Sequence, residues 1–288
     1  MMASKDNNLE VGQDKGAAET PSNDKLGGKK TAAVAAVMAA VIVGAGILFF
    51  IMMQALQAKS DRMEAFPSSY TYAAATSAGG MELHVLATKP SNVTLTAIHN
   101  NVSISPYYGI NGGFFYDKAL LSIAIVNSFP VNGAIGDYGS GNENVKYARG
   151  TLVWDGAANK LSVQVAGKAS ELKVMDHTRF WAQGGISMSL GHDEEWKAQT
   201  EREQAPFPDD LRLRSGAVYD ESGTLYLVVS KTKGTLSQFR EAVTELVGGG
   251  KLVDGIFLDG DGSSQLRSGE AQLAGDNRPV VQMLRIVK

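Results

Sequence analysis

The sequence predicts an α+β (mixed α/β) protein, in which a mixed β-sheet domain with flanking helices follows one transmembrane helix. Three observations lead to this prediction. An uncharged run of 23 residues lies near the start of the chain, short apolar segments with strand-like alternation follow it, and one amphipathic helix is marked by its capping residues. The chain has 288 residues, 44% of them hydrophobic, which is enough to bury a substantial core.

The uncharged run covers residues 31–53 and is expected to cross the membrane once. At about 1.5 Å per residue, a helix of this length spans the hydrocarbon core, which is about 30 Å thick. A buried soluble helix would carry a polar stripe, and a cleaved signal peptide usually has a shorter apolar run followed by small residues at the cleavage site. Residues 54–58 lack such a site, so the segment is predicted to stay as an anchor.

The charges around this segment set its expected orientation. Lys25, Lys29 and Lys30 precede it, whereas Lys59 and Arg62 follow it. This small excess of positive charge on the N-terminal side favours a cytoplasmic N-terminus. We therefore expect a single-pass protein of the cell membrane whose main domain is extracytoplasmic.

Composition divides the rest of the chain into three parts. Residues 1–30 balance five lysines against five carboxylates among many polar residues, which predicts a disordered tail. Residues 54–70 are predicted to be a linker, and residues 71–288 one domain without internal repeats. The net charge of −3, without a basic stripe, argues against a nucleic-acid partner. The absence of cysteine excludes disulfides, thiolate zinc sites and cysteine nucleophiles.

Short apolar segments between turns predict the strands of this domain. They are residues 82–88, 93–98, 120–126, 151–155, 161–165 and 224–230. A helix is predicted to begin after Thr235, which can cap it, and to end at the glycines 248–250. The apolar strand 253–258 follows, so this part is typical of a crossover unit in which part of the sheet is parallel. Residues 193–204 predict a second, highly charged helix, solvated at the surface rather than closed over a cleft as a lid.

Three segments each bring polar or glycine residues to the end of an apolar strand. In residues 109–115 (GINGGFF), paired glycines allow backbone N–H groups to approach an anion, with the aromatic residues packed beneath. Residues 256–264 (IFLDGDGSS) place two carboxylates and two hydroxyls where α/β sheets commonly bind ligands. In residues 212–217 (RLRSGA), an arginine can grip a phosphate through two parallel hydrogen bonds. Taken alone, residues 109–115 would also fit a tight turn. The arginine of residues 212–217 would also fit an ion pair with Asp209 or Asp210.

The second segment has the spacing of a calcium loop in part. Asp259, Asp261, Ser263 and Glu270 match positions 1, 3, 5 and 12 of an EF-hand. However, Ser264 stands where that loop needs glycine, and a strand rather than a helix precedes it. An EF-hand is therefore excluded and no metal ligand is assigned, while a divalent cation (Ca²⁺ or Mg²⁺) stays open as a cofactor.

Taken in order, four motifs resemble the landmarks of the phosphodiester glycosidase family, the group that includes the lysosomal uncovering enzyme. They are NGGFF (111–115), RSGA (214–217), FLDGDGSSQL (257–266) and NRPV (277–280), and WAQGGISMSLG (181–191) resembles the glycine-rich middle segment of that family. The resemblance covers roughly residues 80–288. It implies hydrolysis of the anomeric bond of a sugar-1-phosphodiester, as in N-acetylglucosamine-1-phosphate caps, with an envelope polysaccharide or glycan as the partner.

This resemblance suggests roles for individual residues. Breaking the anomeric bond builds positive charge on the sugar, and Asp259 would stabilise that charge or activate water. Ser263 and Ser264 would orient sugar hydroxyls or the phosphate, and the backbone of residues 111–113 would help to hold the phosphate. Phosphate is already a good leaving group and needs charge stabilisation, which Arg214 would supply. The predicted catalytic residues are thus Asp259 and Arg214. The predicted substrate-binding residues are Asn111, Gly112, Gly113, Ser215, Gly260, Asp261, Gly262, Ser263, Ser264 and Arg278, and all are expected to converge on one pocket.

One residue departs from the family pattern. Asp261 stands where the family loop usually has glycine, so the departure bears on activity rather than on the fold. The alternative prediction is a catalytically inactive phosphoglycan- or carbohydrate-binding envelope protein. A third prediction is an envelope scaffold that works through the membrane helix and the charged segment 193–204. The sequence is also compatible with a homo-oligomer.

Overall fold

The computed structural model describes residue 38, residues 41–53 and residues 66–288. Residues 41–53 are helical. Within the described residues, no helix is both long enough and apolar enough to cross a membrane. The remaining residues of the predicted span, together with the predicted tail 1–30 and residues 54–65 of the predicted linker, lie outside the described residues.

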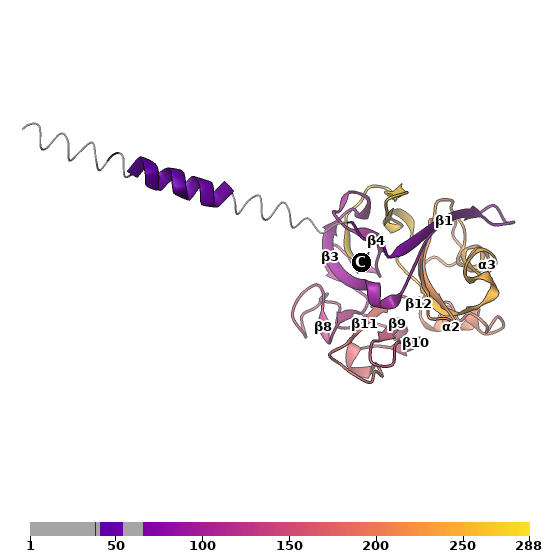
Figure 1. Ribbon diagram of the computed structural model, residues 1–288. Helices are drawn as coiled ribbons and strands as arrows, with labels where there is room; N and C mark the ends of the chain where they lie inside the picture. Colours follow the sequence, from indigo (N-terminus) through magenta and orange to yellow (C-terminus); the bar gives the residue numbers. More distant parts are fainter. Residues whose placement is uncertain (1–37, 39–40, 54–65) are drawn as a thin grey trace, which may run out of the picture. The chain divides into compact units, whose positions relative to one another are not determined.

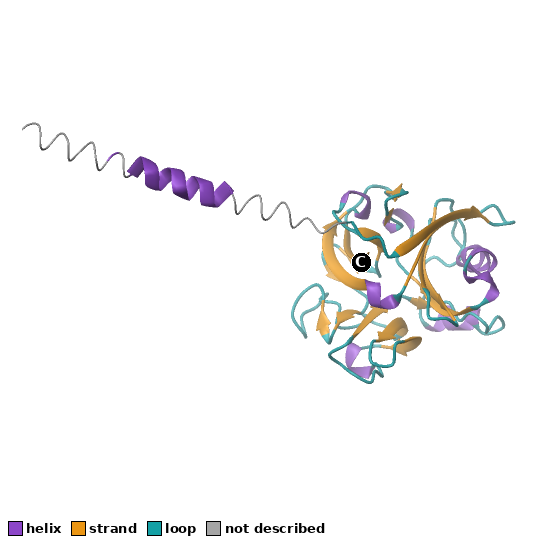
Figure 2. Ribbon diagram, in the orientation of Figure 1, coloured by secondary structure: helices purple, strands orange, loops and turns teal. Residues whose placement is uncertain are grey.

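Residues 66–288 form one compact unit built from three main sheets and a small hairpin (Figures 1 and 2). The six-stranded sheet has the order β1 (Tyr70–Thr76), β2 (Glu82–Thr88), β14 (Leu225–Ser230), β13 (Ser215–Asp220), β15 (Leu252–Phe257) and β12 (Ile186–Ser187). A five-stranded sheet has the order β10 (Lys160–Ala166), β9 (Arg149–Asp155), β11 (Phe180–Gly184), β7 (Ala124–Val126) and β8 (Phe129–Pro130). A second five-stranded sheet has the order β17 (Gln272–Leu273), β16 (Leu266–Arg267), β4 (Tyr108–Asn111), β18 (Val280–Ile286) and β3 (Val93–Asn100), and β5 (Phe115–Tyr116) pairs with β6 (Ala119–Leu120).

Two α-helices accompany the sheets, α2 (Trp196–Arg202) and α3 (Leu236–Leu246). Short 3₁₀ turns occupy Pro90–Asn92, Val102–Ile104, Ala169–Glu171, Gly248–Gly250 and Asp261–Ser263. The mixed, sheet-rich class predicted from the sequence is therefore confirmed, as are both helices. The predicted strand 120–126 is divided between β6 and β7, because Leu121 donates its N–H to Phe114 while Ile123 donates to the side chain of Asn144.

The predicted parallel pairing is wrong. All strand pairs within residues 66–288 are antiparallel. The crossover β14–α3–β15 exists, but β13 lies between the two strands and pairs antiparallel with both. Strands β14 and β15 therefore run in the same direction without bonding to each other. The reason is the tight turn at residues 221–224, which lets β13 pair with β14 as a hairpin before the helix begins.

The central strands β2, β14 and β13 of the six-stranded sheet are buried on both faces, which explains why they are rich in apolar residues, whereas the edge strand β1 is largely exposed. On one face, Leu86, Leu227 and Ile256 share a buried cluster with Ile110 of β4 and Trp181 of β11. This cluster joins the three main sheets. A side chain that changed size here would disturb all three at once, because interiors are packed as densely as crystals.

Helix α3 covers the other face of the same sheet, away from β3 and β4 (Figure 1). Its Phe239 and Val243 are fully buried in a cluster with Val228 of β14 and Phe257 of β15. Phe257 is the last residue of β15, so the helix fixes the strand from which the loop at residues 259–264 departs. The sheet and its covering helix thus set the position of that loop.

Thr235 begins α3 with a capping box, and its loss is expected to destabilise the protein. The Thr235 hydroxyl accepts a hydrogen bond from Gln238 N–H (3.1 Å), and Gln238 Oε1 accepts one from Thr235 N–H (2.9 Å). We expect Thr235→Ala to lower the free energy of unfolding by about 1 kcal/mol, as measured by urea denaturation. Ser237→Ala removes a half-buried hydroxyl of the same turn that donates to Glu241 Oε1 (2.8 Å) at the helix surface, and it should change the free energy of unfolding by less than about 0.5 kcal/mol. Equal effects of the two substitutions would contradict the capping role.

Candidate active site

Hydrogen bonds tie the three polar segments to one another at one end of the six-stranded sheet. Asp259 N–H donates to the carbonyl of Gly112 (3.2 Å), and Asp261 N–H donates to the carbonyl of Leu213 (2.7 Å). Strand β13 begins where the antiparallel strand β15 ends, so residues 213–215 and 258–261 necessarily meet there. The turns around residues 112, 214 and 260 therefore converge, although more than 100 residues separate the first from the second.

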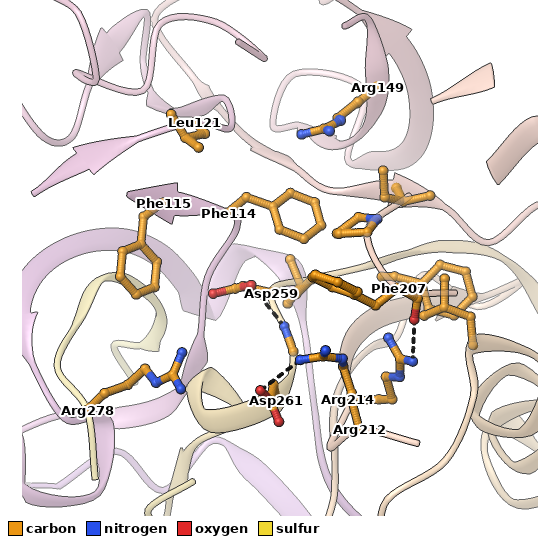
Figure 3. A pocket seen from close by; sticks show the side chains of 16 residues that line it. Phe114, Phe115, Leu121, Arg149, Phe207, Arg212, Arg214, Asp259, Asp261 and Arg278 are labelled. Carbon is orange, nitrogen blue, oxygen red and sulfur yellow. Dashed lines mark hydrogen bonds and ion pairs between the residues drawn. The ribbon is translucent and has the colours of Figure 1, made fainter. Parts of the chain in front are cut away.

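A cavity of about 320 Å³ opens beside this junction (Figure 3). It is lined by Phe114, Phe115, Leu121, Arg149, Ile186, Pro206, Phe207, Arg212, Arg214, Leu236, Phe257, Leu258, Asp259, Gly260, Asp261 and Arg278. Its size is at the lower end of the usual range for small-molecule sites, about 300–1,000 Å³. Four arginines and two aspartates line it among apolar side chains, which favours an anionic ligand with an apolar face.

Asn111 does not line the cavity, in contrast to its predicted contact with substrate. Its side chain is fully buried. Its Oδ1 accepts hydrogen bonds from Ser215 Oγ (2.8 Å) and Gln265 N–H (3.1 Å), and its Nδ2 donates to the carbonyls of Asp259 (2.8 Å) and Gly112 (3.2 Å). The amide is thus fully engaged within the protein. Both Asn111 and Ser215 position the loop that carries Asp259 and are not free to hold a ligand.

Gly112 and Gly113 also lie behind the cavity wall, which corrects their predicted role in anion binding. The N–H of Gly112 donates to the carbonyl of Gln282 (2.9 Å), so it is not available to a phosphate. A Cβ atom at residue 112 would lie 1.7 Å from Gln282 Oε1, and one at residue 113 would lie 2.6 Å from the carbonyl oxygen of Gly184. The two glycines are required here because neighbouring chain segments approach too closely for any side chain.

Asp259 lines the cavity and forms no ion pair within residues 66–288, although Arg278 and Asp261 lie close enough to act on its charge (Figure 3). Its carboxylate accepts hydrogen bonds from Gly260 N–H (3.1 Å) and from the Ser263 hydroxyl. Protein atoms surround it even though the cavity reaches it, and this burial raises the pKa of Asp259 to about 6 against the opposing effect of Ser263. A carboxyl group with such a pKa can change its protonation state near neutral pH.

The remaining hydroxyls and glycines of this loop hold its shape. Ser263 and Ser264 are buried and do not line the cavity. Gly260 lines the cavity, whereas Gly262 is packed so tightly that a Cβ atom there would lie 2.2 Å from the Asp276 carboxylate. Of the two predicted hydroxyl ligands, Ser263 therefore acts on Asp259, and neither serine reaches the space where a ligand would bind.

Asp261 has a backbone conformation that suits glycine. Its φ angle is +56°, a left-handed conformation that glycine adopts freely and that aspartate tolerates better than most residues. Its carboxylate accepts a hydrogen bond from Arg212 Nη1 (3.0 Å). The other two donors of Arg212, Nε and Nη2, bind Asp210 Oδ2 (3.2 and 3.0 Å), so the two carboxylates together neutralise this arginine.

Arg214 is buried and is held by neutral groups rather than by a carboxylate. Its Nε donates to the carbonyl of Gly234 (2.9 Å), and its Nη2 donates to the carbonyls of Phe207 (2.8 Å) and Asp210 (2.7 Å). It forms no ion pair with Asp209 or Asp210 within residues 66–288, and Nη1 makes no hydrogen bond there. Burial lowers the pKa of Arg214 to about 10, so the side chain is still charged at neutral pH.

The structure adds residues that the sequence did not indicate. Arg149 begins β9 and its side chain lines the cavity, as does Phe207 in the loop after α2. Phe114 and Phe115 line the cavity wall instead of packing beneath the turn; their position directly after the paired glycines was the only available signal. Arg278 also lines the cavity, where Asp276 binds its Nε (2.9 Å).

Among the described residues, histidine, aspartate and glutamate do not gather in any group of three or more that could hold a metal ion.

Comparison with known proteins shows a distant likeness of fold. No protein-family model matches the chain, and no curated protein matches it. Among solved structures, the chain is similar to the catalytic domain of zebrafish N-acetylglucosamine-1-phosphodiester alpha-N-acetylglucosaminidase, auto-inhibited by its pro-peptide, with 15% identity and a TM-score of 0.53 over 76% of this chain and 82% of that chain. A hypothetical protein from Synechocystis has 12% identity and a TM-score of 0.40, over 75% of this chain and 61% of that chain. The chain therefore shares, at a distance, the fold of a phosphodiester glycosidase domain.

The buried carboxylate of Asp259 is expected to reduce stability at neutral pH. Its folded-state pKa of about 6 is above the ordinary value near 3.8, so the folded state binds more protons between these values and stability falls as pH rises from about 4 to about 6. We expect Asp259→Asn to raise the free energy of unfolding by about 1–3 kcal/mol at pH 7.5, and the gain to vanish below about pH 4.

Urea denaturation of both proteins across this pH range is the measurement. Asp117→Asn, in an exposed turn outside the cavity, serves as the control and should change stability by less than about 0.5 kcal/mol. If Asp259→Asn instead lowered the free energy of unfolding at pH 7.5, the ionised carboxylate would be stabilising the fold, which would contradict this prediction.

Proposed function

We propose that this protein is a hydrolase that cleaves the anomeric bond of a sugar-1-phosphodiester. The observation that carries the proposal is the pairing, in one cavity, of Asp259, whose pKa is raised to about 6, with Arg214, a buried cation that forms no ion pair within residues 66–288. The carboxylate of Asp259 can stabilise positive charge on a sugar, and the guanidinium of Arg214 can stabilise negative charge on a phosphate. The shared fold with a phosphodiester glycosidase domain supports the same reading.

The proposed mechanism separates charge across the cavity. As the anomeric C–O bond breaks, the sugar gains oxocarbenium character and the leaving phosphate takes the electron pair of the bond. Ionised Asp259 stabilises the sugar cation or accepts a proton from the attacking water. Arg214, through Nη1, donates to the phosphate oxygen, and its effect is strengthened because the side chain is buried. Phe114 and Phe207 offer apolar faces to the ring.

The proposed substrate is a phosphodiester-linked sugar of the cell envelope, and the proposed location is the cell membrane. A linkage of the N-acetylglucosamine-1-phosphate type in an envelope polysaccharide or glycan fits the size and the charge of the cavity. Residues 31–53, an uncharged run of 23 residues, would anchor the protein in the cell membrane with a cytoplasmic N-terminus. The domain of residues 66–288 would then meet its substrate on the extracytoplasmic side.

A second candidate function is binding without turnover. The observation that favours it is the ion pair between Asp261 and Arg212, which places a carboxylate on the cavity wall and occupies an arginine. A phosphate would meet repulsion from Asp261 and would find Arg212 already neutralised. The protein would then bind a phosphoglycan or another carbohydrate in the envelope without cleaving it.

Turnover by the full-length chain tests the first proposal. The substrate is the methyl phosphodiester of N-acetylglucosamine-1-phosphate, and released sugar is measured. We expect Asp259→Asn to lower kcat by about 10²–10⁴-fold and Arg214→Gln by about 10²–10³-fold. Arg202→Gln, an exposed arginine outside the cavity, should stay within about twofold of the unaltered protein. Near-native turnover by a folded Asp259→Asn protein would remove the carboxylate from the mechanism.

The pH profile gives an independent check on Asp259. Because the ionised form is the active one and its pKa is about 6, kcat/KM should fall about tenfold for each pH unit below about 6 and level off above it. The residual kcat/KM of Asp259→Asn should not show this fall below about pH 6. A flat profile between pH 4 and 8 in the unaltered protein would contradict the assignment.

Asp261→Gly distinguishes the two candidate functions. Glycine suits the φ angle of +56° at this position, so the fold should be kept while the carboxylate is removed and Arg212 is released to the ligand. We expect KM for the methyl phosphodiester to fall by about three- to tenfold. Activity gained only in Asp261→Gly would establish the binding function for the natural sequence, and an unchanged KM would show that Asp261 does not compete with the phosphate.

A further inference from the structure

The four arginines of the cavity differ in what holds them. Arg212 and Arg278 are each paired with aspartates, at residues 210 and 261 for the first and at residue 276 for the second. Arg149 and Arg214 donate hydrogen bonds to backbone carbonyl groups and form no ion pair within residues 66–288. Arg149 also lies over the rings of Phe114 and Tyr147. The cavity therefore has two cations whose charge is not cancelled by a bonded carboxylate.

Arg149 is anchored at the end of α2. Its Nε donates to the carbonyl of Glu203 (3.0 Å) and its Nη2 to the carbonyl of Gln204 (3.2 Å). The nearby Glu203 carboxylate is buried and already accepts hydrogen bonds from Gly150 N–H (2.8 Å), Ser187 N–H (2.8 Å) and Ser187 Oγ (2.6 Å). Burial lowers the pKa of Arg149, which is the effect expected of a cation withdrawn from water without full compensation.

Arg149 and Arg214 lie on opposite sides of the cavity (Figure 3). In that view the ring of Phe114 lies between them, and the Arg149 guanidinium is 5.2 Å from its centroid. Nη1 of Arg149, like that of Arg214, makes no hydrogen bond within the described residues. A ligand whose sugar ring lay against Phe114 would thus have a cation at each end.

We propose that the cavity takes a sugar that carries an acidic group on each side, with the scissile phosphodiester at Arg214 and a second phosphate at Arg149. The inference rests on the proposed function and extends it to a substrate class: a repeating sugar-phosphate chain in which each ring lies between two phosphates. A cavity of about 320 Å³ suits one such ring with the adjoining acidic groups. A carboxylate on the sugar ring, as in a uronic acid, could bind Arg149 through the same charge-assisted hydrogen bonds. The experiment distinguishes a second phosphate from such a carboxylate.

The test compares three methyl phosphodiester probes on the full-length chain. One carries N-acetylglucosamine alone, one carries an added phosphate at C4 or C6, and one has a carboxylate at C6. In the unaltered protein, kcat/KM for the phosphorylated probe should exceed that for the plain probe by about 10- to 100-fold, with the carboxylate probe between them. In Arg149→Gln this ratio should fall to about one, and Arg149→Lys should keep part of it. Arg202→Gln should keep the ratio unchanged.

The ratio separates a ligand contact from a structural role, because loosening α2 would affect all probes alike. A ratio near one in the unaltered protein, or an unchanged ratio in folded Arg149→Gln, would overturn the inference. If Arg149→Gln does not fold, Arg149→Lys and the salt dependence provide the test. The preference of the unaltered protein for the phosphorylated probe should shrink between about 50 and 500 mM NaCl. A preference that does not change with salt would also overturn the inference.

Failure of the proposed function gives a different result. If no probe is hydrolysed, calorimetry with N-acetylglucosamine-1-phosphate and its 1,6-bisphosphate measures the same preference as a ratio of Kd values. A bisphosphate that binds about tenfold more tightly, with the preference lost in Arg149→Gln, would support the second acidic site without catalysis. Equal affinities would overturn it.

Discussion

The buried side-chain amide of Asn111 is the interaction on which the site depends. Its four hydrogen bonds join the end of β4, the start of β13 and the loop after β15, and they add to the backbone hydrogen bonds between these segments. An unsatisfied polar group in such a place is costly, so the amide accepts only one arrangement of the three segments. The position of Asp259 is therefore fixed by a residue that does not line the cavity.

Electrostatics in the cavity follows from this rigid frame. Asp259 lies where few groups stabilise its charge, and Arg149 and Arg214 are held by carbonyl groups that neutralise nothing. Each of these charges destabilises the empty site, because water is replaced by fixed and incomplete partners. An anionic ligand would relieve part of this cost on binding, which is why perturbed groups of this kind favour a functional interpretation over a structural one.

Secondary structure was predictable where its signals were local. Strand β2 occupies the predicted residues 82–88, and α3 follows the predicted cap at Thr235, because alternation and capping depend on a few neighbouring residues. The pairing of strands was not predictable in the same way. Strand β13 lies between β14 and β15, and nothing within any one segment states which other segment it will bond.

The sequence by itself determined which loops are candidates for the site: Arg214, Asp259 and Asp261, which belong to two of the motifs, line one cavity. Only the tertiary structure decided which neighbouring residues face that cavity. It turned Asn111 and the paired glycines inward and brought in Arg149 and Phe207 from segments without a motif. The physical reason is that the direction of a side chain at a strand end depends on packing and hydrogen bonds with segments distant in sequence, whereas a motif records only residues that are adjacent.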